Sequence, residues 1–209
     1  MYLGGLCFIT DRTVCSRSCE DMVRTVLEAG ATWVQYRDKE GSRRDLYRNA
    51  LTLRSITREF HAAFIVNDHT DIALAADADG VHLGQDDLPA QEARVMLGRD
   101  RLIGLSTHTV EQAIHAEESG ADYLGFGPIF HTATKAAGSP RGIEVLPLLK
   151  RHVRIPVVAI GGITLENVGS VLETGVDAVA VASAILTGDI QENTRRFLEI
   201  IRSYAKITQ

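Results

Sequence analysis

Eight short apolar segments recur along the chain, and each is followed by a stretch with helical periodicity. The segments are Leu6–Ile9, Trp33–Tyr36, Phe64–Val66, Gly80–Leu83, Leu102–Leu105, Tyr123–Phe126, Val157–Ile160 and Ala178–Ala182. Most are nearly continuous runs of apolar residues, which is typical of parallel strands that are covered on both faces. Eight alternating strand and helix units predict a closed (β/α)8 barrel, also called a TIM barrel.

The intervening stretches support this architecture. Apolar residues recur there at spacings of three and four, for example at Leu46, Ala50 and Leu53, as an amphipathic helix requires. Similar short sequence motifs contain Gly30, Gly120 and Gly175, and glycine fits the left-handed conformation that terminates a helix. An open doubly wound sheet is the alternative, but no G-x-G-x-x-G motif opens a helix after the first strand.

Size and composition limit the other possibilities. The 209 residues, 45% of them apolar, predict one domain over residues 1–209, and the net charge of −5 argues against nucleic acid as a partner. No apolar run approaches the ~20 residues of a membrane helix, so we expect a cytoplasmic protein with no membrane partner. Cys7, Cys15 and Cys19 form an odd, clustered set, which favours reduced thiols over disulfides; a metal or redox role is the less favoured alternative.

Active sites of (β/α)8 barrels lie at the carboxyl ends of the strands, so the residues that follow each strand are candidates. Gln35-Tyr36-Arg37-Asp38-Lys39 spans the end of the second strand. Arg37 and Lys39 occupy alternate positions and should point to the same side of an extended chain. Two cations and the Gln35 amide on one face suit a polyanion. A solvated, charged loop is the alternative.

Acidic residues follow the next two strands. Asn67-Asp68 follows the third strand and Asp87 lies in the loop after the fourth. Two carboxylates at the ends of neighbouring strands can share a Mg²⁺ ion that also binds phosphate oxygens. Helix capping is the competing interpretation, since Asp and Asn are common N-caps.

The loops after the fifth and sixth strands carry hydroxyl and amino groups. Ser106 can donate to a phosphate or cap the helix that begins near Val110. The connection over residues 127–142 is unusually long, which favours a functional loop, and it contains Thr132-Ala133-Thr134-Lys135. Its terminal glycines could let it close over a ligand.

The last two strands are followed by Gly161-Gly162 and by Ala182-Ser183. These two loops often form the phosphate site of the fold. Glycine allows a close backbone approach, and Ser183 should open a helical turn whose N–H groups favour an anion. A catalytic role for His108 or His131 is an open alternative, and His82 is expected to be a hydrogen-bonded histidine of the barrel.

Seven segments occur in one order along the chain: Gln35–Lys39, Val66–Asp68, Gly80–Pro89, Gly104–His108, Gly125–Phe130, Thr132–Lys135 and Ala159–Ile163. Together they resemble the thiamin phosphate synthase family nearly from end to end. The resemblance implies a Mg²⁺-dependent transferase with two phosphorylated small-molecule substrates, a pyrimidine and a thiazole. Diphosphate would leave 4-amino-5-hydroxymethyl-2-methylpyrimidine diphosphate, and the nitrogen of 4-methyl-5-(2-phosphoethyl)thiazole, or of its carboxylated form, would attack. A homodimer is a family-level expectation.

The resemblance also implies roles for individual residues. It assigns the pyrimidine diphosphate to Gln35, Arg37, Lys39, Asn67, Ser106 and Lys135, with Arg37, Lys39, Ser106 and Lys135 as the catalytic set. It assigns Mg²⁺ to Asp68 and Asp87. The remaining expected substrate-binding positions are Tyr36, Asp38, Thr132, Ala133, Thr134, Gly162, Val181, Ala182 and Ser183. Tyr36, Asp38 and Ala133 depart from the common family pattern of Leu, Glu and Pro, which puts the kinetics of the loop in doubt more than the reaction.

Three other functions remain open at this point. The sister family of thiazole tautomerases shares the barrel but lacks the diphosphate and metal set, and Pro128 stands where those proteins can carry a histidine. A sugar-phosphate isomerase or epimerase would need an acid and a base facing a C–H bond. A non-catalytic barrel would bind the thiazole phosphate without turnover.

Overall fold

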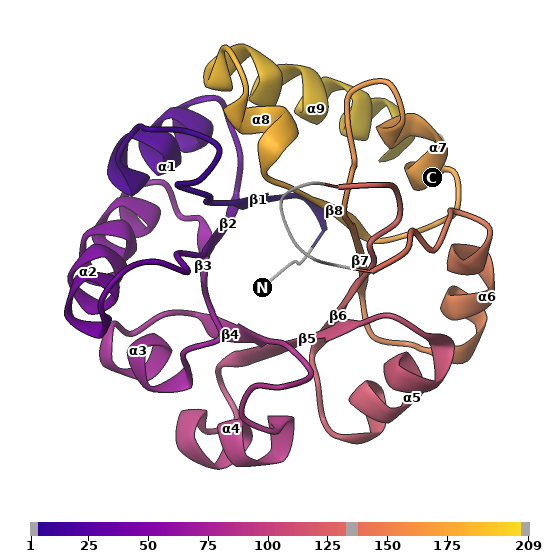
Figure 1. The fold of residues 1–209 in the computed structure, drawn as a ribbon, viewed down its shortest axis with the longest axis horizontal. Helices are drawn as coiled ribbons and strands as arrows, with labels where there is room; N and C mark the ends of the chain where they lie inside the picture. The colour runs from indigo at the N-terminus through magenta and orange to yellow at the C-terminus, as the bar shows by residue number, and fades with distance from the viewer. Residues whose placement is uncertain (1–3, 133–137, 206–209) are drawn as a thin grey trace.

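The computed structural model describes residues 4–132 and 138–205, which form a closed barrel of parallel strands surrounded by helices (Figure 1). Neighbouring strands pair in chain order, and the parallel pairing of β8 with β1 closes the ring. The strands are β1 (Gly5–Ile9), β2 (Trp33–Tyr36), β3 (Ala63–Asn67), β4 (Gly80–Leu83), β5 (Leu102–Thr107), β6 (Tyr123–Phe126), β7 (Val157–Ile160) and β8 (Ala178–Val181). The predicted barrel is confirmed, and the open doubly wound sheet is wrong.

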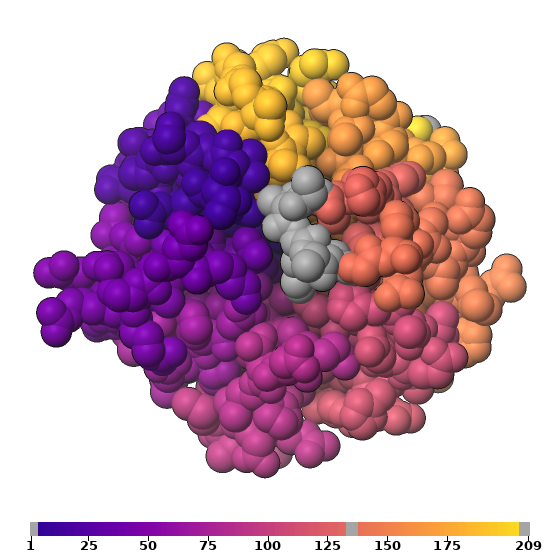
Figure 2. Space-filling view, viewed as in Figure 1, coloured from indigo at the N-terminus to yellow at the C-terminus, as the bar shows by residue number. Residues whose placement is uncertain are grey.

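The helices lie outside the ring and follow the strands in order. They are α1 (Cys19–Glu28), α2 (Arg43–Glu59), α3 (Thr70–Ala75), α4 (Ala90–Leu97), α5 (Val110–Glu118), α6 (Val145–His152), α7 (Val168–Leu172), α8 (Ser183–Leu186) and α9 (Ile190–Ala205). Successive units lie side by side in Figure 2, and the first and last meet where α9 packs against α1. Within the described part of the chain, no helix is long and apolar enough to span a membrane.

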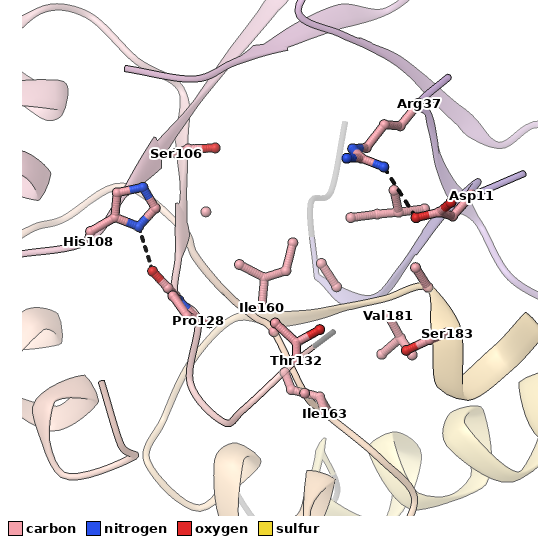
Figure 3. A pocket seen from close by; sticks show the side chains of 17 residues that line it. Asp11, Arg37, Ser106, His108, Pro128, Thr132, Ile160, Ile163, Val181 and Ser183 are labelled. Carbon is pink, nitrogen blue, oxygen red and sulfur yellow. Dashed lines mark hydrogen bonds and ion pairs between the residues drawn. The ribbon is translucent and has the colours of Figure 1, made fainter. Parts of the chain in front are cut away.

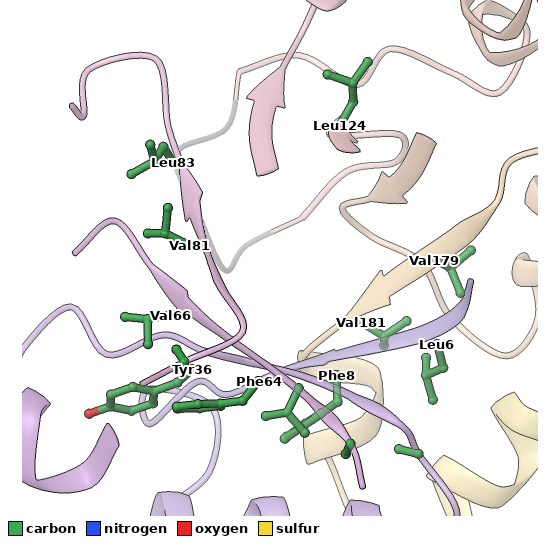
Figure 4. Close-up of a cluster of buried hydrophobic side chains, with 14 of the residues drawn as sticks. Leu6, Phe8, Tyr36, Phe64, Val66, Val81, Leu83, Leu124, Val179 and Val181 are labelled. Carbon is green, nitrogen blue, oxygen red and sulfur yellow. The ribbon is translucent and has the colours of Figure 1, made fainter. Parts of the chain in front are cut away.

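The main core lies between the strands and the helices. Phe8, Phe64 and Val81 point outward from β1, β3 and β4 and are fully buried there (Figure 4). Burying one such side chain stabilises the fold by about 1.5–3 kcal/mol. Their neighbours along each strand point the other way, into the barrel, because side chains alternate along a strand. This alternation decides which residues can reach a site inside the ring.

The inside of the barrel is filled by the rings of Trp33 and Tyr123 together with aliphatic side chains such as Ile9, Ile65 and Val158. Trp33 and Tyr123 meet edge to face, with ring centroids 5.3 Å apart. Gly104 makes room for the second ring, since a Cβ atom there would lie 2.1 Å from the Tyr123 ring. Gly125 likewise leaves room for the His82 ring, which a Cβ atom would approach to 2.9 Å. These rings form a solid floor beneath the carboxyl ends of the strands.

A repeated ionic latch ties the opposite, amino-terminal end of the barrel together. Asp79, Asp122 and Asp177 directly precede β4, β6 and β8. Each carboxylate accepts a backbone N–H from the start of the neighbouring strand β3, β5 or β7, at 2.7–2.8 Å. Each also pairs with a cation from the helix that precedes β3, β5 or β7, namely α2, α4 or α6. The cations are Arg54, Arg94 and Lys150. Charge-assisted bonds of this kind fix the strand ends far from the carboxyl-terminal rim.

Helix ends also follow the sequence pattern. Gly30, Gly120 and Gly175 have φ angles of 103°, 85° and 82°, so the predicted left-handed helix ends are confirmed. The hydroxyl groups of Ser18, Ser42 and Thr109 accept backbone N–H groups at the starts of α1, α2 and α5.

The three cysteines are free thiols, as predicted. Cys7 and Cys19 are buried, and burial raises the pKa of Cys7 strongly and the pKa of Cys19 to about 11. We therefore expect a thiol reagent near neutral pH to modify Cys15 first, because it alone of the three is partly exposed and thiolates are the reactive form. Mass spectrometry of the alkylated protein, folded and urea-unfolded, measures this order. Rapid labelling of Cys7 in the folded protein would contradict it.

Candidate active site

A cavity opens at the carboxyl ends of the strands, where the fold class predicts a site (Figure 3). Seven of the predicted site residues line it: Arg37, Ser106, Thr132, Gly162, Val181, Ala182 and Ser183. Arg37 and Ser106 reach toward the cavity from opposite sides, with Ile160 between them (Figure 3). The wall therefore combines a cation and hydroxyl groups with apolar side chains, as sites for phosphorylated organic ligands do.

Arg37 is held in place by the residues that follow β1. Its Nη1 donates to the buried carboxylate of Asp11 at 3.2 Å. Asp11 also accepts bonds from the backbone N–H and the hydroxyl of Thr13, at 2.9 and 2.6 Å. The fully buried hydroxyl of Thr10 donates to the Arg37 carbonyl at 3.0 Å and accepts the Arg37 N–H at 2.8 Å. Both the backbone and the guanidinium of Arg37 are thus fixed before any ligand arrives.

Ser106 and His108 extend the wall from the end of β5. The Ser106 hydroxyl lies 2.9 Å from Nε2 of His82, and the ring is buried. His108 places Nδ1 2.6 Å from the Gly127 carbonyl, so Nδ1 carries the hydrogen there. The helix α5 is capped by Thr109 instead, which leaves the Ser106 hydroxyl available to the cavity.

Gly161 and Gly162 shape the side of the cavity after β7. Both have positive φ angles, 97° and 67°, and a Cβ atom on them would lie 2.6 Å from Pro128 and 2.5 Å from the His131 carbonyl. Only glycine allows this close approach at a left-handed position. The start of the long loop is tied here, since the N–H groups of Ile129 and Phe130 donate to the carbonyls of Ile160 and Gly161.

Asp68 and Asp87 face each other at the ends of β3 and β4, beside Lys39. Lys39 pairs with Asp68, and the carboxyl group of Asp87 lies within interaction distance of Asp68. Burial raises the pKa of Asp87, and the facing Asp68 raises it further. Burial works against ionisation of Asp68 too, but the bonds from Lys39 and Asp87 outweigh it and hold the pKa of Asp68 below its usual value.

Neither carboxylate caps a helix. Helices α3 and α4 begin after His69 and Pro89, without a side-chain cap. Asp87 instead accepts the N–H of Gly84 at 2.7 Å within its own loop, and Asp68 has a left-handed backbone with φ of 64°. The capping interpretation is therefore wrong for both residues. Backbone strain of this kind is often found at functional sites.

The carboxyl pair fits a hard cation. Two facing carboxylates repel each other when both are ionised, a bound cation relieves that repulsion, and carboxylate oxygens are ligands that Mg²⁺ prefers. The described residues contain no group of three or more His, Cys, Asp or Glu side chains that could hold a metal alone. An ion held by Asp68 and Asp87 would complete its shell with water and phosphate oxygens, which is the usual arrangement for Mg²⁺.

Two of the expected ligand side chains point elsewhere. Tyr36 is 2% exposed and packs on the helix side of β2, where Asn49 donates to its hydroxyl. Asp38 is buried, accepts the N–H groups of Glu40 and Gly41, and pairs with Arg12. The reason is the strand alternation that turns Arg37 toward the cavity and its neighbours away from it.

The remaining expected residues either lie on the barrel strands or fall outside the described residues. Gln35 is buried at an inward-facing position of β2, two residues beyond Trp33, and Asn67 ends β3 in register with His82. Ala133, Thr134 and Lys135 lie outside the described residues. The sequence analysis did not predict Asp11 as a site residue, although it lies in the loop that follows β1.

A cavity lined by a guanidinium, hydroxyl groups and apolar side chains at the carboxyl end of a (β/α)8 barrel places this chain in the class of barrel enzymes. The sequence model of one family of that class, described as thiamine monophosphate synthase, matches residues 6–185. The chain belongs to this family and is accordingly a transferase of thiamine biosynthesis.

Individual relatives agree along nearly the whole chain. The thiamine-phosphate synthase of Clostridium acetobutylicum is 44% identical over 199 residues, which cover 94% of each chain. That of Chlorobium luteolum is 48% identical over 197 residues, covering 94% of this chain and 92% of the relative. The solved structure of thiamine phosphate pyrophosphorylase from Pyrococcus furiosus superposes with a TM-score of 0.89 at 41% identity and covers 96% of both chains.

Proposed function

We propose that the enzyme joins 4-amino-5-hydroxymethyl-2-methylpyrimidine diphosphate to 4-methyl-5-(2-phosphoethyl)thiazole, or its carboxylated form, to give thiamin phosphate and diphosphate. The facing carboxyls of Asp68 and Asp87 beside Lys39 carry this proposal. We propose that they form a cation site beside the cavity that Arg37 lines; Asp68, Asp87 and Lys39 are not themselves among its lining residues. Family membership supports the synthase activity.

The first half of the site would hold the diphosphate that leaves. Asp68 and Asp87 would bind Mg²⁺, and bound Mg²⁺ supplies positive charge that stabilises the departing diphosphate. Arg37 offers a fixed guanidinium for phosphate oxygens, Lys39 adds an ammonium group, and Ser106 adds a hydroxyl donor. Gln35 and Asn67 are proposed to orient the pyrimidine, and Lys135 to contact the diphosphate.

The second half would hold the phosphate that stays on the thiazole. Gly162 and Ser183 line the cavity after β7 and β8, with Val181, Ala182 and Thr132 beside them. The first N–H groups of a helical turn, such as the one that begins at Ser183, lack intrahelical acceptors and favour an anion. Thr134 and Ala133 belong to the same proposed group.

The proposed bond changes need no general base. The C–O bond to diphosphate breaks, and its electron pair leaves with the diphosphate. The aminopyrimidine bears the positive charge at its methylene carbon until the lone pair of the thiazole nitrogen forms the new C–N bond. That nitrogen carries no proton to remove. The chain's own task is therefore to bind, to orient and to stabilise charge.

Mixing the two substrates with Mg²⁺, with and without a chelator, and following diphosphate release tests the proposal. We expect release that needs both substrates and stops on chelation. Chelator-insensitive turnover would remove the metal assignment, and absent release would leave a thiazole-phosphate-binding barrel or a tautomerase. The proposal also places the enzyme in the cytoplasm with small molecules as partners; a homodimer stays a prediction.

Asp11→Asn should lower kcat/KM for the pyrimidine diphosphate by roughly tenfold, because it removes the charge that fixes the Arg37 guanidinium. The amide can still accept the Thr13 hydrogen bonds, so little stability should be lost. Steady-state kinetics of diphosphate release measures the effect. If Arg37→Ala and the double variant Asp11→Asn/Arg37→Ala were equally impaired, the carboxylate would act through Arg37; additive losses would contradict that.

A further inference from the structure

A chain of three side chains connects the floor of the barrel to the cavity. The Tyr123 hydroxyl lies 3.1 Å from Nδ1 of His82, and Nε2 of the same ring lies 2.9 Å from the Ser106 hydroxyl. Tyr123 and His82 are buried, at 1% and 7% exposure, whereas Ser106 lines the cavity. The three residues come from β6, β4 and β5, which are neighbouring strands, and the register of these strands brings the side chains together.

Burial decides which atom carries each hydrogen. Burial raises the pKa of Tyr123 well above its ordinary value, so the hydroxyl keeps its hydrogen. Among the described residues, Nδ1 of His82 is the sole hydrogen-bond partner of that hydroxyl. A hydrogen on Nδ1 would leave the buried Tyr123 O–H without an acceptor, which native proteins avoid. The Tyr123 hydroxyl therefore donates to Nδ1, and the ring carries its hydrogen on Nε2.

The protonation of Nε2 also sets the direction of the next hydrogen bond, from His82 to Ser106. A hydrogen on Nε2 of His82 donates to the Ser106 oxygen. The Ser106 hydroxyl has no other hydrogen-bond partner among the residues that the structure describes, so its own hydrogen is left for an acceptor in the cavity. Its oxygen is already engaged by a strong donor, and accepting a second hydrogen from a ligand becomes less favourable.

We propose that Tyr123 and His82 are positioning residues that hold Ser106 as a hydrogen-bond donor toward the substrate. The identity of the acceptor, a diphosphate oxygen or a pyrimidine nitrogen, rests on the proposed function. This hydrogen-bonded triad favours ligands that place an acceptor atom opposite Ser106 and disfavours ligands that place a donor there. A serine hydroxyl without such partners can both donate and accept, and so discriminates less between them.

The barrel is built around these rings. A Cβ atom on Gly104 would lie 2.1 Å from the Tyr123 ring, and one on Gly125 would lie 2.9 Å from the His82 ring. The T-shaped contact of Trp33 holds the Tyr123 ring from another side. The rings of Tyr123 and His82 are therefore held in fixed orientations against the backbone of Gly104 and Gly125. Because these hydrogen-bonding groups are already ordered, they lose little conformational entropy when a ligand binds.

The hydrogen position can be measured without substrate. In protein labelled with ¹⁵N-histidine, long-range ¹H–¹⁵N NMR should show a His82 ring with Nε2 protonated and Nδ1 bare, assigned by its loss in His82→Gln. Tyr123→Phe removes the hydroxyl and keeps the ring, and it should abolish the single fixed form. Ser106→Ala is the matched control at the other end and should leave Nε2 protonated. A hydrogen on Nδ1, or an unchanged spectrum in Tyr123→Phe, would overturn the proposal.

Kinetics separates positioning from simple packing. His82→Leu should lower kcat for diphosphate release by about ten- to a hundredfold with little change in KM, because a transition-state donor loses its orientation. His82→Gln places an amide N–H near the former Nε2 and should recover most of that loss. Equal losses in both variants would contradict the donor role. If the wild type released no diphosphate, the proposed function would fail, and the NMR result would still decide the hydrogen positions.

Discussion

Asp87→Ala should slow diphosphate release by about a hundredfold or more, and Asp68→Ala by a similar factor. The two carboxyls face each other beside Lys39, and each alanine would remove half of the protein's contribution to the proposed cation site. The leaving diphosphate would then lose much of the charge that stabilises it. Steady-state rates over a range of Mg²⁺ concentrations measure the effect, and the Mg²⁺ needed for half-maximal rate should rise.

The same loop provides a matched control. Asp86 precedes Asp87 and is exposed, so Asp86→Ala removes an equal charge without touching the facing pair. We expect a rate within about twofold of the wild type, since an exposed charge is screened by water and salt. Near-normal rates in both Asp68→Ala and Asp87→Ala would show that the pair has no role in turnover.

Asp79→Ala should lower the free energy of unfolding by about 3 kcal/mol, because it breaks a largely buried ion pair and leaves Arg54 without its partner. The carboxylate binds Arg54 through two bonds, at 2.8 and 3.0 Å, and also accepts the Phe64 N–H at 2.8 Å. Urea unfolding followed by circular dichroism measures the loss. The rate constants of the folded enzyme should change little, since the latch and the cavity lie at opposite ends of the barrel.

Asp77 supplies the control for this prediction. It lies two residues earlier and pairs with both Arg58 and Arg101, yet its side chain is 59% exposed. Exposed ion pairs contribute about 0–1 kcal/mol, so Asp77→Asn, which removes the charge and tolerates the left-handed backbone at φ of 52°, should cost less than 1 kcal/mol. Equal losses for the two variants would mean that burial does not distinguish the latch from an ordinary surface pair.

The strands could be predicted from the sequence because a strand that is covered on both faces consists of a nearly continuous run of apolar residues. Trp33–Tyr36, Gly80–Leu83, Tyr123–Phe126 and Val157–Ile160 have the bounds that the apolar runs indicate. Closure of the barrel followed from the number of units, but the pairing of β1 with β8 joins residues far apart in the chain. No local pattern encodes that contact directly.

In the candidate site, too, some features follow from the local sequence and others depend on contacts between distant residues. The alternation that puts Arg37 and Lys39 on one side of the chain was visible in the sequence, and applied strictly it puts Tyr36 and Asp38 on the other side. The contact of Asp68 with Asp87 depends on how two loops fold back, since both residues could equally have capped helices. The bond between Tyr123 and His82 spans 41 residues and requires a bare Gly125 beneath the ring. Such contacts arise from the pairing of neighbouring strands and the packing of the loops that follow them, which no local sequence pattern specifies.

The latches at the amino-terminal end have a consequence for how the chain becomes a barrel. Each joins residues no more than 28 positions apart, and together they mark off three successive blocks that end with β4, β6 and β8. Short loops close at a low entropic cost, so each block can gain its ionic contact before the ring is complete. We expect these three blocks to form early in folding, and the pairing of β8 with β1, which joins residues far apart in the chain, to form late.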